Sequence, residues 1–96
     1  MDVTFNFLLQ ATRVLNFGKY SENELNMIKK FLLSLDSESL YSYNNTQTII
    51  TYNNDLELYL EIIDAIIKIY EDVENYEVCH LLKLKRAEAI NILNTK

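Results

Sequence analysis

The chain has 96 residues, of which 49% are hydrophobic and 24% charged, and its formal net charge at pH 7 is −5. This length accommodates one domain, and the composition excludes a largely disordered chain. The negative charge argues against direct nucleic-acid binding, because phosphates repel an acidic surface.

Two residue types that interrupt helices are scarce, since proline is absent and Gly18 is the single glycine. The sequence therefore predicts a mainly α protein. A first helix is expected over residues 4–17, and Gly18 then suits a left-handed C-terminal cap. A second helix is expected over 21–35, because Ser21 and Glu24 have capping-box spacing. The apolar stripe of the first helix comprises Phe7, Leu8, Ala11, Val14 and Leu15. Joined by a short turn, the two helices predict an antiparallel hairpin.

The helical period is lost between residues 36 and 53. The segment from Thr46 to Tyr52 is rich in β-branched and aromatic residues, which favours a short β-hairpin over residues 40–52, with an irregular loop as the alternative. Exposed tyrosines often anchor interfaces. Three tyrosines gather here and are candidate partner-binding residues, with partial burial against the helices as the alternative: Tyr41, Tyr43 and Tyr52.

A third helix is expected over residues 55–72, with Asn54 and Glu57 as a second capping box. A fourth is expected over 75–94, which gives a small four-helix domain of two helical hairpins. The third helix is apolar around most of its circumference, so it is either central or covered by a second chain. Since a small monomer covers such a helix poorly, we predict a homodimer.

Charge is unevenly distributed along the chain. Residues 55–77 contain eight carboxylates and one base, Lys68, whereas residues 78–96 have a net charge of +3. One interpretation is that acids near helix starts and bases nearer the helix end interact favourably with the helix dipole. The other is that an acidic ridge binds a basic protein partner. We define the acidic ridge as Glu61, Asp64, Glu71, Asp72, Glu74 and Glu77.

No constellation of residues points to catalysis. Cys79 and His80 are neighbours, so on a helix their side chains diverge by about 100° and do not form a nucleophile–base pair. Glu77 and His80 have the spacing used in di-metal helical bundles, but those sites need further such motifs and the chain has one histidine. We expect no enzymatic activity, no metal and no cofactor.

The start of the chain lacks a basic region followed by an apolar stretch, so we expect no signal peptide. The most apolar window, residues 56–70, includes charged residues that a membrane span would exclude. A cytoplasmic protein is therefore expected. The bias toward Asn, Ile and Tyr is typical of an A/T-rich genome, either of a bacterium or of one of its viruses; a viral protein would act in the host cytoplasm.

Residues 74–83 follow the third helix and read Glu-Asn-Tyr-Glu-Val-Cys-His-Leu-Leu-Lys. Within the span 60–93 they resemble the UVR motif, a helical hairpin found in bacterial excision-repair subunits and some kinase regulators. The matching positions are Tyr76, Glu77, Cys79, Leu82 and Lys83. The departures are Asn75 for an acid, His80 for a small residue and Leu84 for an acid. The resemblance implies a protein–protein docking hairpin without catalysis.

These observations predict a non-enzymatic interaction or regulatory module, such as an adaptor, that binds a protein and no membrane. The alternative is an acidic inhibitor, encoded by a phage, that mimics nucleic acid and blocks a basic nucleic-acid-binding enzyme.

Overall fold

The computed structural model describes residues 3–95 of the chain, and their side chains from residue 9 onward. Within that range it has five helices and no strand, and the helices contain about three quarters of the residues. They are α1 (Val3–Phe17), α2 (Glu22–Ser34), α3 (Ser37–Tyr43), α4 (Asp55–Asp72) and α5 (Tyr76–Leu93). The mainly α prediction is confirmed. Of the predicted stripe of α1, the side chains of Phe7 and Leu8 lie outside the described part.

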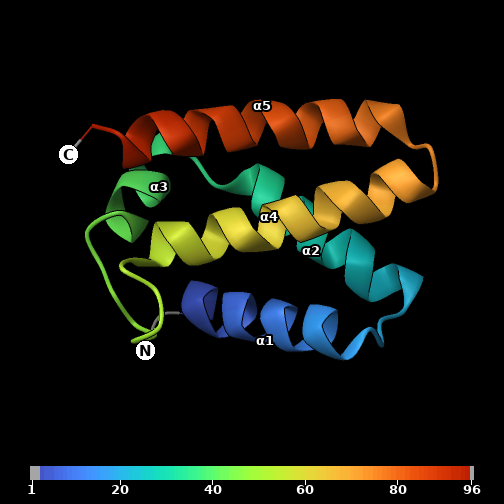
Figure 1. Ribbon diagram of the computed structural model, residues 1–96, viewed down its shortest axis with the longest axis horizontal. Helices are drawn as coiled ribbons and strands as arrows, with labels where there is room; N and C mark the ends of the chain where they lie inside the picture. Colours follow the sequence, from blue (N-terminus) through green and yellow to red (C-terminus); the bar gives the residue numbers. More distant parts are fainter. Residues whose placement is uncertain (1–2, 96) are drawn as a thin grey trace.

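Helix α4 is the centre of the molecule. It lies between α1 and α5, and it also contacts α2 and α3 (Figure 1). Leu58, Ile62 and Ile66 widen its apolar surface, and all three are buried inside the same chain. Of the two alternatives, a central helix or one covered by a second chain, this burial supports the first, and a homodimer stays a prediction.

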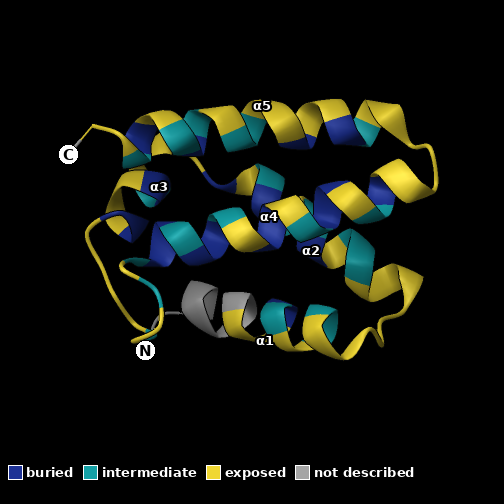
Figure 2. Cartoon of the chain, in the orientation of Figure 1, coloured by how far each residue is buried: buried dark blue, intermediate teal, exposed yellow. Residues whose placement is uncertain are grey.

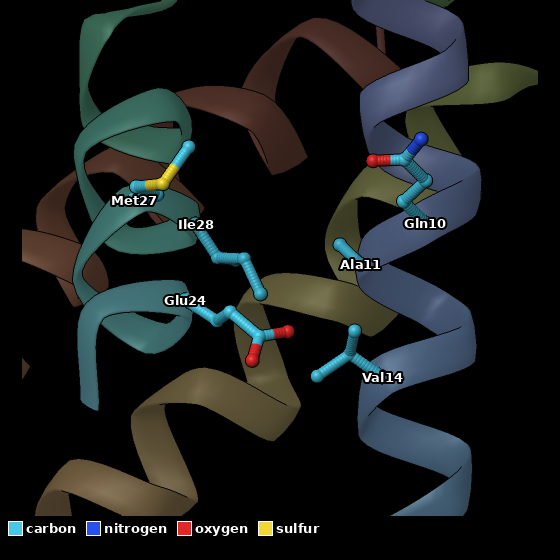
Figure 3. A pocket seen from close by; sticks show the side chains of 6 residues that line it. All are labelled: Gln10, Ala11, Val14, Glu24, Met27 and Ile28. Atoms are coloured by element: carbon cyan, nitrogen blue, oxygen red, sulfur yellow. The ribbon is translucent and has the colours of Figure 1, made fainter. Parts of the chain in front are cut away.

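The connection between α1 and α2 has the predicted local geometry. Gly18 takes a φ of 65°, and the capping box forms in both directions, with 3.1 Å between each backbone nitrogen of Ser21 and Glu24 and the side-chain oxygen of the other. The helices then diverge, because α1 packs mainly against α4 rather than α2. A cavity of about 90 Å³ lies between them where Ile28 points toward Ala11 (Figure 3). The first two helices are thus linked by a capped turn without packing closely as a hairpin.

The predicted β-hairpin over residues 40–52 does not form in the described chain. Residues 37–43 are helix α3 instead, started by the Asp36 carboxylate, which accepts a hydrogen bond from the Ser39 backbone N–H at 2.8 Å. Two side chains one turn apart, Leu40 and Tyr43, hold α3 on the core. The Tyr43 ring meets the Tyr59 ring edge to face, with 6.4 Å between centroids.

The segment between α3 and α4 is a loop tied to the start of α4. The buried Asp55 carboxylate accepts hydrogen bonds from the Thr46 hydroxyl (2.6 Å), the Thr48 N–H (2.9 Å) and the Thr48 hydroxyl (2.8 Å). Asn54 caps α4 by accepting the Glu57 N–H at 2.9 Å. Among the bonds described, the Glu57 side chain accepts from Asn53 (3.5 Å) and not from the Asn54 backbone, so half of the second capping box is present.

A second buried polar side chain fixes the other end of this loop. Asn44 donates to the Ile92 carbonyl of α5 at 3.0 Å and accepts from the Asn54 amide at 3.0 Å. The loop is therefore held by both long C-terminal helices. Of the helices described, none is long and apolar enough to span a membrane.

Candidate interaction surface

The acidic ridge divides into two parts. The first part lies on the solvent-facing stripe of α4, which Figure 2 shows as exposed residues alternating with buried ones. Here Asp64 pairs with Arg86 of α5, and Glu71 lies 3.5 Å from the ammonium nitrogen of Lys83. Glu61 accepts a hydrogen bond from the Tyr52 hydroxyl, which raises the pKa of Tyr52. These acids already have partners within the chain.

The second part of the ridge lies at the turn between α4 and α5. Asp72, Glu74 and Glu77 are exposed and make no ion pair with any residue of the described chain. Unpaired acids at one end of the molecule raise the local negative potential, because no ion pair within the described chain offsets them. The charge available to a partner is therefore concentrated at this turn.

The turn has a fixed backbone geometry. Asn75 N–H donates to the Tyr70 carbonyl at 2.9 Å, and Glu74 N–H donates to the Glu71 carbonyl at 3.0 Å, which is the Schellman arrangement. Glu74 occupies the left-handed position with a φ of 59°. Glycine is usual there, and a residue with a Cβ costs about 1–2 kcal/mol in this conformation.

Replacing Glu74 by glycine is expected to raise the free energy of unfolding by about 0.5–1 kcal/mol, because relief of backbone strain exceeds the added freedom of the unfolded chain. Urea unfolding followed by circular dichroism measures the difference. The matched control is Glu77→Gly in the first turn of α5, which should destabilise by up to about 1 kcal/mol. Equal losses for both variants would contradict the strain at Glu74.

Two large apolar side chains share the turn with these acids. Val73 is 67% exposed and Tyr76 is 66% exposed. We call the set Asp72, Val73, Glu74, Tyr76 and Glu77 the tip surface. The sequence analysis selected its acids, and Tyr76 as a position of the UVR-like hairpin, but missed Val73 as a contact residue. The sequence signal that could have identified this surface is the pair of apolar residues Val73 and Tyr76, which stand among acids at the break between two helices.

The three candidate tyrosines do not form one surface. Tyr43 is buried, so its assignment as a partner-binding residue is wrong. Its helix, α3, has only one face available for the core, and Tyr43 lies on that face. Tyr52 is half-buried against Glu61, and Tyr41 is 48% exposed on α3, at the end of the molecule opposite the tip surface (Figure 1).

The remaining polar residues of α5 lie in the core, on the surface or at a helix end. The Cys79 thiol is buried and lies 3.6 Å from the Ile67 carbonyl, whereas His80 is exposed on α5. Residues of the described chain form no group of three or more His, Cys, Asp or Glu that could hold a metal ion. Lys85 donates to the Leu35 carbonyl at 2.7 Å, which caps the end of α2.

Comparisons of the chain with protein-family models, curated proteins and solved structures find no match. Function is therefore argued from the geometry of the tip surface and its surroundings. The UVR resemblance stays a prediction that rests on the residues quoted for it.

Proposed function

We propose that the protein is a non-enzymatic protein–protein interaction module that docks through the tip surface. The observation that carries this proposal is the exposure of Val73 and Tyr76 beside three acids without a partner in the described chain. Exposed aromatic and aliphatic side chains supply binding energy once a partner excludes water from them. Flanking charges speed association and orient the partner. We propose the cytoplasm as its location, where Cys79 stays reduced.

The support beneath the tip surface favours the same function. Helices α4 and α5 are the most extensively packed pair, and Cys79, Leu82 and Ala89 of α5 are buried. A tip held by a packed hairpin loses little conformational freedom on binding, so less of the contact energy is spent on ordering.

The UVR resemblance points to the same end of the hairpin. Tyr76 and Glu77, its aromatic and acidic positions, both belong to the tip surface. The docking role that the resemblance implies is therefore consistent with the proposal and adds to its support.

The test is an affinity capture with the purified protein as bait and a lysate of its source organism as prey. The double variant Val73→Ser/Tyr76→Ser should lose a partner that the wild type retains, with affinity falling at least about tenfold. The matched control, Tyr41→Ser/Ile50→Ser, removes exposed apolar side chains from α3 and the loop after it and should retain that partner. A partner held equally by the wild type and the tip variant would contradict the proposal.

The second candidate function is an acidic inhibitor, encoded by a phage, of a nucleic-acid-binding enzyme. The exposed acids along one stripe of α4 favour it, although three ridge acids are engaged within the chain. An inhibitor of this kind needs the whole ridge, so the triple variant Glu61→Gln/Asp64→Asn/Glu71→Gln, which changes the three ridge acids outside the tip surface, should weaken binding severalfold at about 50 mM salt and less at about 300 mM. A module that docks through the tip surface should be nearly unaffected by that variant.

A further inference from the structure

A groove adjoins the tip surface. It lies between the first half of α2 and the last turn of α4, and its volume is about 670 Å³. We call it the α2–α4 groove. Its apolar lining comprises Tyr20, Leu25, Ile69, Tyr70 and Val73. Val73 belongs to both the groove and the tip surface, so a partner on the tip surface reaches the groove directly.

The walls of the groove suit a peptide backbone. Asn23 and Asn26 of α2 line it, and among the residues that the structure describes neither side chain has a hydrogen-bond partner. An asparagine amide offers both donors and an acceptor, which matches the alternating N–H and C=O groups of an extended segment. An apolar lining with polar amides above it is typical of sites that accept one side chain and hold the main chain beside it.

The charged residues around the groove determine whether a positively or a negatively charged ligand is favoured. Glu22 and Lys29 line the groove itself, and Asp72, Glu74 and Glu77 lie on the adjoining turn and the start of α5. The groove lining itself has one acid and one base, and the three acids beside it make the combined region negative. Burial raises the pKa of Tyr70, and the Glu22 carboxylate raises it further, which places that negative charge close to the groove lining. A basic ligand complements this potential.

We propose that the α2–α4 groove binds an extended segment of a partner protein in which an aromatic or aliphatic side chain is adjacent to Lys or Arg. The apolar side chain sits against Leu25, Ile69 and Val73, and the basic side chains face the acids of the turn. This inference rests on the proposed function, because the groove and the tip surface form one continuous contact area.

The experiment uses a phage-displayed library of random dodecapeptides, selected against the full chain. Enriched sequences should carry Lys or Arg next to an aromatic or aliphatic residue. A synthetic copy of the most enriched peptide should bind Asn26→Arg at least about tenfold more weakly than wild type. The arginine side chain would occupy the groove, and its positive charge would repel the basic peptide. The control Asn91→Arg, exposed on α5, should bind as wild type does. Because Asn26 is half-buried, the exposed variant Asn23→Arg repeats the test, with folding checked by circular dichroism.

Either of two results overturns the inference: no basic sequence is enriched, or the peptide binds Asn26→Arg and Asn23→Arg as tightly as wild type. The proposed function fails separately. Suppose that Val73→Ser/Tyr76→Ser loses a captured partner while the groove variants still bind the peptide. The proposal that the protein docks through the tip surface then stands, and the assignment of the groove as a peptide site is wrong. If the tip variant keeps its partner, the proposed function is wrong whatever the peptides show.

Discussion

Replacement of Leu82 by alanine is expected to lower the free energy of unfolding by about 2–5 kcal/mol. Leu82 is fully buried on α5, in the contact with α4 that supports the tip surface. Alanine removes apolar area from the core and leaves a cavity that the packed hairpin closes only in part. Since a domain of this size is stable by about 5–15 kcal/mol, the loss is a large share of the total. Urea unfolding followed by circular dichroism measures it.

The neighbouring leucine provides the control. Leu81 is 46% exposed on the same helix, so Leu81→Ala should cost less than about 1 kcal/mol. Helix propensity changes equally in the two variants, which isolates burial as the cause. Similar losses at both positions would mean that α5 presents a different face to α4.

The second large effect is expected at Asp55. Its carboxylate is 5% exposed and accepts three hydrogen bonds from Thr46 and Thr48. Asp55→Ala should lower the free energy of unfolding by about 2–4 kcal/mol, because three hydrogen bonds to a buried charged group are lost. The loop between α3 and α4 should then become more accessible to protease.

Asp55→Asn is the matched variant, since it keeps the shape and one acceptor oxygen while removing the charge. It should cost less than the alanine variant, with protease cleavage in the loop closer to wild type. If asparagine and alanine were equally damaging, the negative charge rather than the hydrogen bonds would organise this loop.

Much of the fold was predictable because its determinants are local. The capping box of Ser21 and Glu24, the left-handed Gly18 and the apolar periodicity of the long helices are all properties of short stretches of sequence. Helix α3 was missed because seven residues are too few to show a helical period. Its one clear local signal was Asp36, a good N-terminal cap. The β-branched residues beyond it suggested strand, but Asp55 holds that segment as a loop through tertiary hydrogen bonds.

The parts of the site that escaped prediction depend on which helices become neighbours. The wide apolar surface of α4 suggested a second copy, whereas four other helices of the same chain contact it. The sequence does not show which acids Lys83 and Arg86 meet, whereas the α4–α5 hairpin brings them to Glu71 and Asp64. Pairing of those acids leaves the turn as the part of the acidic ridge without an ion pair in the described chain, a distinction that charge counting along the sequence cannot make.

The central claim is that the tip surface is where the protein meets its partner. The most direct measurement compares backbone amide NMR signals of the labelled chain with and without the partner identified by capture. We predict that the largest changes occur at residues 72–77, with smaller ones along the α2–α4 groove and almost none at residues 57–64. Changes centred on residues 57–64, with the turn unaffected, would contradict the account and favour the acidic inhibitor.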